Sequence, residues 1–219
     1  LPVSLQLKTP KNLVASSSLQ AKGGKYVASS YQKLTDAPIL VAAADTVHLQ
    51  LANMDILISV YSPNQKIKAA EVAQQISPLL KAQLKYLGGK FPVNNYAFLI
   101  VMSAHLKNGS YGALEHAQSS FYYLPEDSIQ VMGPVIQDVS AHEFFHIQTP
   151  LNLHSKEIGS FDFQNTQMSK HLWLYEGLTE YAAHHMQLQG GLISLTEFLN
   201  RMTEKYRASN FSYDNSIPF

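Results

Sequence analysis

The stretch His142-Glu143-Phe144-Phe145-His146 carries side chains that could hydrolyse a bond with the help of a metal ion. On a helix, residues four apart lie on one face about one turn apart. The two imidazoles can therefore bind one ion, and zinc accepts such ligands at roughly 2.0–2.1 Å. Glu143 is rotated about 100° from His142, so its carboxylate lies beside the ion and can take a proton from an activated water. The spacing predicts two zinc ligands, His142 and His146, and one general base, Glu143, with Phe144 and Phe145 facing the core.

A catalytic zinc site usually has three protein ligands and one open position. The metzincin continuation of the motif is absent, because Thr149 and Asn152 take the places of its glycine and third histidine. The remaining candidates are carboxylates further along the chain, namely Glu157, Asp162, Glu176 and Glu180. The first two fall in an expected polar loop, whereas Glu176 lies on an expected helix that could pack across the first one. The predicted metal ligands are therefore His142, His146 and Glu176.

Glu180 is one turn beyond Glu176 on the same helix face. In that position it could accept the free N–H of a ligand histidine and so fix which ring nitrogen faces the metal. The alternative is an ordinary solvated helix carboxylate. Both interpretations stay open from the sequence.

The elements that must position these residues follow from periodicity. Residues 1–62 contain short alternating strands and no convincing helix, and the turn at 62–64 is a candidate boundary. The rest alternates helical and extended stretches: helix 67–87, strand 96–103, an extended stretch 109–123, helix 139–148, a polar loop 150–170, helix 171–189 and a last helix ending near 207. We expect an α+β fold with a β-rich segment, 1–62, before a catalytic domain, 63–219.

Composition excludes several classes of function. Sixteen Lys and Arg balance sixteen Asp and Glu, which argues against nucleic acid or an anionic membrane surface as partner. The absence of cysteine excludes disulfides, thiolate metal sites and a cysteine nucleophile. No apolar run approaches the roughly 20 residues that a membrane-spanning helix needs.

The motifs also carry a family resemblance. HEFFH followed by WLYEGLTEY resembles the gluzincin metallopeptidases, whose third ligand is the glutamate of the second segment. The 29 residues between the second histidine and Glu176 make a longer gap than in the aminopeptidase N family. That gap resembles the glycyl aminopeptidase family, and so do the stretches 29–40, 112–119 and 190–194.

The resemblance implies a thermolysin-like zincin catalytic domain with a mixed sheet, preceded by a β domain and followed by a PDZ domain. It also implies a substrate strand at 112–116. Gly112 and Ala113 on an exposed edge would let a peptide backbone pair closely, as in β-augmentation. Glu115 would bind the free α-ammonium of the substrate, although an ordinary strand carboxylate is the alternative.

We therefore expect a zinc-dependent aminopeptidase that removes small N-terminal residues from peptide substrates. A catalytically silent domain that binds peptides or a protein partner is the alternative, and a purely structural zinc is disfavoured because structural sites are usually closed and often contain cysteine. The residue that stabilises the oxyanion is open among His184, His185, Tyr206 and Tyr213. We expect a periplasmic, secreted or cell-envelope protein, and a fragment that lacks part of its β domain, the end of its catalytic domain and the PDZ domain.

Overall fold

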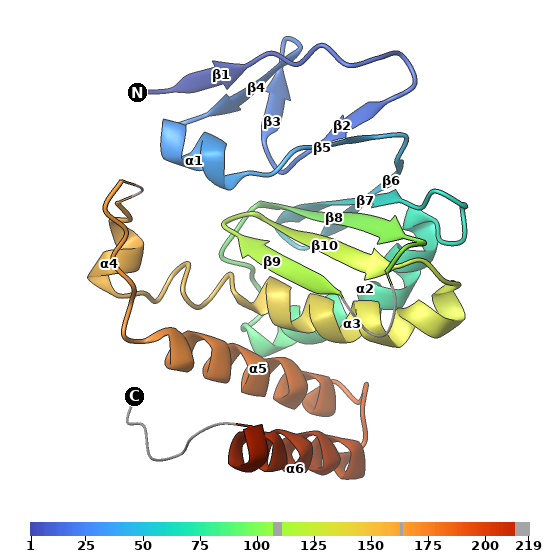
Figure 1. The fold of residues 1–219 in the computed structure, drawn as a ribbon, viewed down its shortest axis with the longest axis vertical. Helices are drawn as coiled ribbons and strands as arrows, with labels where there is room; N and C mark the ends of the chain where they lie inside the picture. The colour runs from blue at the N-terminus through green and yellow to red at the C-terminus, as the bar shows by residue number, and fades with distance from the viewer. Residues whose placement is uncertain (107–110, 163, 213–219) are drawn as a thin grey trace.

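The computed structural model of the chain describes residues 1–106, 111–162 and 164–212. Its centre is a five-stranded mixed sheet (Figure 1). The strands, in spatial order, are β6 (Asp45–Leu51), β7 (Met54–Tyr61), β8 (Asn95–Ser103), β10 (Ser119–Pro125) and β9 (Gly112–His116). The inner strands β7, β8 and β10 run parallel, whereas the two edge strands are antiparallel to their neighbours. The sheet and the helices confirm the expected α+β class.

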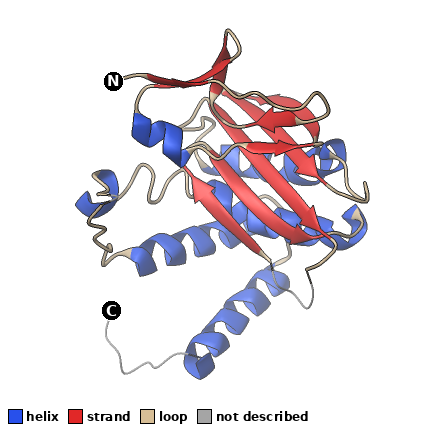
Figure 2. Cartoon of the chain, turned by 45° about the horizontal axis from the view of Figure 1, so that its top comes forward, coloured by secondary structure: helices blue, strands red, loops and turns tan. Residues whose placement is uncertain are grey.

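The middle strand β8 is apolar and buried along most of its length. A continuous buried run is typical of a strand with both faces covered. Helices α2 (Ala69–Tyr86) and α3 (Ile129–Phe145) cover one face, and the first strands of the chain lie over the other (Figure 1). In Figure 2 the long helices lie behind and below the sheet.

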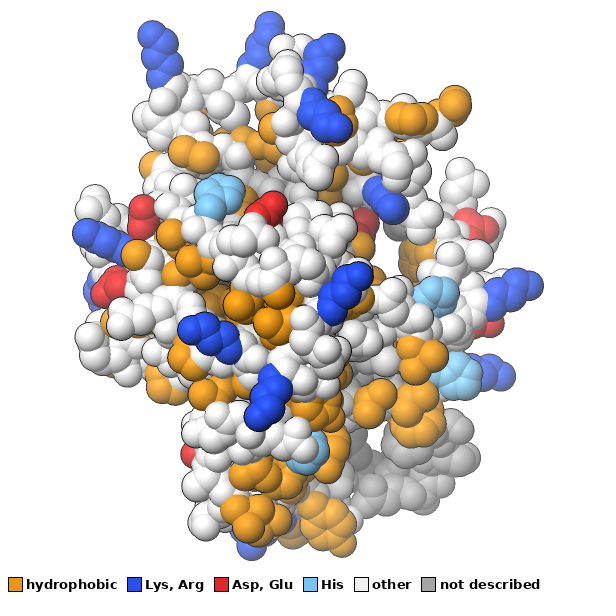
Figure 3. Space-filling model, turned by 180° about the vertical axis from the view of Figure 1, so that it is seen from behind, with side chains coloured by type: hydrophobic (Ala, Val, Ile, Leu, Met, Phe, Trp, Pro, Cys, Tyr) orange, Lys and Arg blue, Asp and Glu red, His pale blue; other side chains and the backbone are white. Residues whose placement is uncertain are grey.

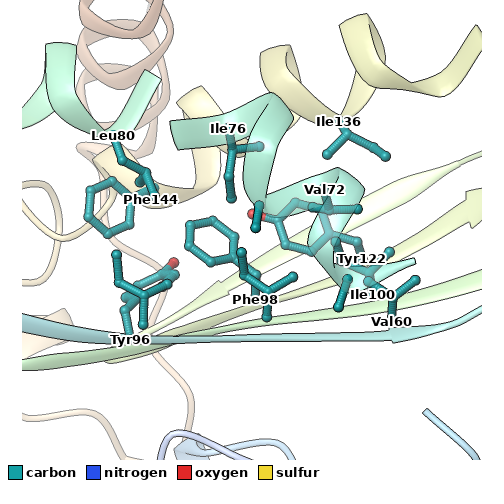
Figure 4. Packing of buried hydrophobic residues seen from close by; sticks show 14 of the residues in the cluster. Val60, Val72, Ile76, Leu80, Tyr96, Phe98, Ile100, Tyr122, Ile136 and Phe144 are labelled. Atoms are coloured by element: carbon teal, nitrogen blue, oxygen red, sulfur yellow. The ribbon is translucent and has the colours of Figure 1, made fainter. Parts of the chain in front are cut away.

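The core lies between the sheet and helices α2 and α3 (Figure 4). Helix α2 directs Val72, Ile76 and Leu80 toward the sheet, and all three are buried, as their helical spacing predicts. Helix α3 adds Phe144, whose ring meets those of Tyr96 and Phe98 at centroid distances of 4.8 and 5.9 Å. This packing fixes the helix that carries the histidines against the sheet.

The first 42 residues form two small antiparallel sheets. The first contains β1 (Val3–Leu5), β4 (Lys25–Ala28) and β3 (Gln20–Lys22), and the second pairs β2 (Val14–Ser16) with β5 (Leu40–Ala42). A short helix, α1 (Tyr31–Asp36), follows β4, so the expectation of no helix before residue 62 is wrong. The Ser30 hydroxyl accepts the Lys33 N–H at the N-terminus of this helix. The helix has only six residues, so it is too short to show an apolar periodicity in the sequence.

The candidate boundary at residues 62–64 falls between elements of one sheet. Strand β7 precedes it and pairs along its length with β8, which follows it. The division of the chain at residue 62 stays a prediction. Strand pairing places β6 and β7 in the same sheet as the later strands.

Three further helices complete the described part of the chain: α4 (Lys156–Gly159), α5 (Leu172–Gln189) and α6 (Leu195–Ser212). Helix α5 ends at Gly190 and Gly191, where the sequence predicts its end, and Gly191 adopts φ +71°. Ser194 caps α6 by accepting the Glu197 N–H. In Figure 3 hydrophobic side chains gather on the lower part of the molecule, where α6 lies, and Leu195 and Leu199 are more than half exposed. None of the helices described here is both long and apolar enough to cross a membrane.

Candidate metal centre

Helices α3 and α5 bring the three predicted ligands together. His142 lies in the last turn of α3, His146 is the residue that caps its C-terminus, and Glu176 lies in the second turn of α5. The Nε2 atoms of the two histidines are 3.1 Å apart. Glu176 Oε2 is 3.2 Å from His142 Nε2 and 3.7 Å from His146 Nε2.

These distances suit a zinc ion. Ligand atoms at roughly 2.0–2.1 Å from a tetrahedral zinc are about 3.3 Å apart from one another. The three donor–donor distances, 3.1, 3.2 and 3.7 Å, lie around that value. His146 is buried and His142 is mostly buried, whereas the Glu176 side chain is nearly half exposed, so solvent reaches part of the donor set.

Outer contacts fix the orientation of both imidazoles. His142 Nδ1 lies 2.6 Å from Glu180 Oε2, and His146 Nδ1 lies 2.8 Å from the Thr149 carbonyl oxygen. Because these oxygens can only accept, each Nδ1 carries the proton and each Nε2 directs a lone pair toward the other ligands. Two lone pairs and a carboxylate oxygen in such proximity repel one another unless a cation, either a metal ion or a proton, lies between them. The donor set therefore fits a metal ion.

Without a metal ion, a proton takes the place of the cation on His142, because the same two carboxylates favour the charged imidazole. Burial alone would lower its pKa, but hydrogen bonds to Glu176 and Glu180 outweigh burial and raise the pKa to about 10. Groups that favour a proton on the imidazole favour a metal cation at the same place. Burial would raise the pKa of Glu180, yet the hydrogen bonds from His142, His184 and Lys205 hold it well below its ordinary value. Glu180 thus occupies the position that an outer-shell role requires.

Glu143 lies beside the donors rather than among the three. Its side chain is buried, and burial raises its pKa to about 7 despite the opposing effect of His142, with Glu115 and Glu176 adding to the rise. A carboxyl group whose pKa is near neutrality can both accept and return a proton. The position and the pKa match the properties expected of a general base.

Strand β9 brings Glu115 to the same place. Carboxylate oxygens of Glu115 and Glu143 and a ring nitrogen of His146 lie within 4.8 Å of one another. Gly112 and Ala113 lie earlier on this strand, which is the outer edge of the sheet. A Cβ atom added at Gly112 would meet no atom within 4 Å, so there is open space beside the edge.

The short helix α1 supports the end of β9. Asp36 Oδ2 accepts the Ala117 N–H at 3.0 Å, and Asp36 Oδ1 lies 3.5 Å from His116 Nδ1. Here a cavity of about 510 Å³ opens between α1, the turn after β9 and residues 151–152. The first part of the chain therefore lines a cavity near the end of β9, which the sequence did not indicate.

The other candidate ligands lie elsewhere. Asp162 accepts backbone N–H groups from residues 164 and 165, and neither it nor Glu157 belongs to a donor cluster among the described residues. Of the four carboxylates considered from the sequence, Glu176 is the one that joins both histidines in a donor cluster among the described residues, and its role as a ligand stays a prediction.

Three of the four candidates for oxyanion stabilisation lie among the described residues. His184 binds Glu180, His185 stacks on Tyr181, and Tyr206 is 71% exposed on α6. His184 and His185 point to different partners, as expected for adjacent helix residues. Tyr213 lies outside the described residues.

Apart from Glu180, the outer contacts of the two histidines are not predictable from the sequence. The Thr149 carbonyl that orients His146 is a backbone group, so no residue type announces it. Thr179 lies behind it, with its hydroxyl 3.0 Å from that of Thr149. Lys205 and Arg201 approach from α6, and their only sequence signal is a four-residue spacing that many solvated helices share.

A segment that includes His142, His146 and Glu176 matches a known family. Residues 136–215 match the model of the M61 glycyl aminopeptidase family. The predicted resemblance to the glycyl aminopeptidases is thus confirmed over this segment, which contains HEFFH and WLYEG. No curated protein matches the chain.

Solved structures share the fold. An aminopeptidase N family protein from Idiomarina loihiensis superposes with a TM-score of 0.74 at 18% identity, over 91% of this chain and 36% of that one. A mutant of the M1 zinc metallopeptidase from Deinococcus radiodurans superposes with a TM-score of 0.51 at 15% identity, over 96% of this chain and 44% of that one. The chain therefore shares its fold with these two proteins, and it spans less than half of their length.

Proposed function

We propose that the chain carries the catalytic centre of a zinc-dependent metallopeptidase with a thermolysin-like zincin fold. The observation that carries the proposal is the convergence of His142, His146 and Glu176 at zinc-ligand spacing with Glu143 beside them. The family match and the two structural relatives support a peptidase. The donor set of two imidazoles and one carboxylate is one that catalytic zinc sites use.

Each residue then has a defined task. Bound zinc would act as a Lewis acid that polarises the scissile carbonyl and acidifies a water molecule. Glu143 takes a proton from that water as its oxygen bonds to the carbonyl carbon. Glu143 then returns the proton to the leaving nitrogen as the C–N bond breaks, which yields a carboxylic acid and an amine.

Strand β9 would bind the peptide as an added strand. No strand pairs with its outer edge among the described residues, and the open space beside Gly112 leaves room for a second backbone, with Ala113 as the next residue along the strand. Glu115 would bind the α-ammonium of the substrate, because its carboxylate lies within 4.8 Å of Glu143 and His146. A fixed anion at this distance from the base favours an aminopeptidase that removes single N-terminal residues.

The second candidate is a silent domain that binds peptides. The observation that favours it is the engagement of His184, His185 and Tyr206 away from the donor set, which leaves the oxyanion without an identified second donor among the described residues. Against it stands the buried Glu143, whose side chain makes no hydrogen bond with the described part of the chain that would explain it as a structural residue.

Hydrolysis by wild type and Glu143→Gln separates the two candidates. Aminoacyl reporter substrates with small N-terminal residues are assayed with zinc-loaded protein and again after chelation. The peptidase predicts a loss of kcat of roughly 10²–10⁴-fold in the variant, the usual contribution of general acid–base catalysis, while zinc stays bound. Equal background rates in both proteins, with peptide binding retained, would favour the silent domain.

A further inference from the structure

Helix α6 presents two cations to the helices that carry the metal ligands. Lys205 Nζ contacts Glu180 Oε1, and His184 Nε2 lies 3.1 Å from the same oxygen. The other oxygen of Glu180 lies 2.6 Å from His142 Nδ1. Lys205 and His184 thus share one oxygen of Glu180, and His142 contacts the other. The Glu180 side chain therefore connects Lys205 to a predicted metal ligand.

Arg201 lies one turn before Lys205 and contacts both ligand helices. Its Nη1 is 2.5 Å from Asp138 Oδ1 on α3, one turn before His142, and 3.1 Å from His184 Nδ1 on α5. Since a guanidinium only donates, His184 Nδ1 must accept and its proton sits on Nε2, directed at Glu180. Arg201 thereby sets the tautomer that lets His184 hold Glu180.

We propose that Lys205 and Arg201 are positioning residues for the metal centre, acting through Glu180 on His142. The inference rests on the proposed function, because it assigns a task to α6 in holding the zinc ligands. Two donors keep Glu180 Oε1 in place, so Oε2 stays on His142 Nδ1 and the imidazole keeps its Nε2 lone pair toward the metal. Loss of such an outer partner typically weakens metal binding by 10–100-fold.

Electrostatics alone predicts the opposite sign. A cation near the site repels the metal ion, so removing Lys205 would tighten binding if charge were decisive. Lys205 is nearly half exposed, however, and it contacts Glu180 rather than a metal ligand, so water and salt screen its charge from the metal. Position therefore outweighs repulsion, and the variant should bind zinc more weakly.

The test measures zinc affinity by competition with a chromophoric chelator, so it does not depend on activity. Lys205→Gln should bind zinc about tenfold more weakly than wild type. Lys205→Arg keeps the charge and donor and should restore most of the affinity. Arg207→Gln removes an exposed cation from the same helix and should leave the affinity unchanged. The visible spectrum of the Co²⁺ form should change in Lys205→Gln alone, because the orientation of His142 changes.

The outcomes separate this inference from the proposed function. If the wild type binds no zinc, both fail. If the wild type binds zinc and Lys205→Gln binds it equally well or more tightly, only the positioning role is overturned. Unfolding of the metal-free proteins provides the structural control, because an exposed ion pair contributes little to stability and the three variants should unfold close to the wild type.

Discussion

Glu115 and Glu143 reach the same small volume from two different elements. Glu115 comes from the edge strand β9 and Glu143 from helix α3, and both lie within 4.8 Å of His146. The negative charge of Glu115 adds to the rise in the pKa of Glu143, while the two side chains differ in their surroundings. Glu143 is buried beside the donor set and suits proton transfer, whereas Glu115 is partly exposed on an open edge and suits a substrate cation.

This difference predicts a selective defect for Glu115→Gln. Losing the charge should reduce kcat/KM for peptides with a free amino terminus by roughly 10–100-fold, the range of a charged hydrogen bond, mostly through KM. N-acetylated peptides should be cleaved poorly by both proteins and to a similar extent. Glu157→Gln, at a carboxylate outside the donor clusters, is the matched control and should behave like wild type. An equal loss on free and acetylated peptides would rule out ammonium recognition by Glu115.

Helix α3 has two faces with separate tasks. The histidines face α5, whereas Phe144, rotated about 200° from His142, faces the sheet and contacts Phe91 at a centroid distance of 5.4 Å. Because Phe144 is fully buried, its packing determines where the helix sits. The metal geometry thus depends on core residues that touch no ligand.

Phe144→Ala should therefore destabilise the fold by about 3–5 kcal/mol, the usual cost of removing a buried aromatic ring. Denaturant unfolding of the metal-free protein measures this free energy. Val131→Ala on the exposed side of the same helix should change it by no more than about 0.5 kcal/mol. Similar small effects of both substitutions would mean that α3 does not depend on this aromatic contact.

The elements that the sequence predicts well are those with long periods. The helices at 67–87 and 171–189 and the strand at 96–103 appear within two residues of their expected bounds. Helix α3 begins ten residues before the expected start. The prediction placed the start too late because Gly133 and Pro134, which lie inside the helix, are residue types typical of a break. In the fold Gly133 lies against α2, where an added Cβ would lie 3.0 Å from the Gln75 side chain. The glycine thus serves helix packing, which a single sequence does not reveal.

The metal ligands could be proposed from the sequence because they lie in local patterns. His142 and His146 are linked by a local spacing, and Glu176 follows from its segment. The contacts of Asp138, Arg201 and Lys205 depend on how α6 folds back over α3 and α5. Only the assembled helices bring these residues together, so no local pattern could predict them.

At the scale of the whole molecule, Glu126 joins the end of β10 to the loop that leads from β7 into α2. Its buried carboxylate accepts the Ser62 hydroxyl at 2.5 Å and the Asn64 backbone N–H at 2.8 Å. Burial alone would raise the pKa of Glu126, but these hydrogen bonds and that from the Asn64 side chain lower it. The ionised form is therefore favoured in the folded state.

A depressed pKa has a defined consequence for stability. The contribution of Glu126 is complete above its unfolded pKa, about 4.3, and is lost as the pH falls through its lower folded value. Glu126→Gln should lower the free energy of unfolding by about 1–3 kcal/mol at pH 7, and the gap to wild type should narrow below about pH 4. Urea denaturation across pH measures this. Asp55→Asn, at an exposed carboxylate on β7, should show no such gap, and a gap for Glu126→Gln that widens in acid would contradict the assignment.

The most direct test of the central claim is zinc stoichiometry. After zinc loading and dialysis, elemental analysis should find one zinc per chain in the wild type and in Glu143→Gln, because Glu143 is the base and not a ligand. His146→Ala, which removes a buried donor, should retain far less than one. A wild-type protein that holds no zinc, or a His146→Ala protein that holds as much as the wild type, would contradict a metal centre built from His142, His146 and Glu176.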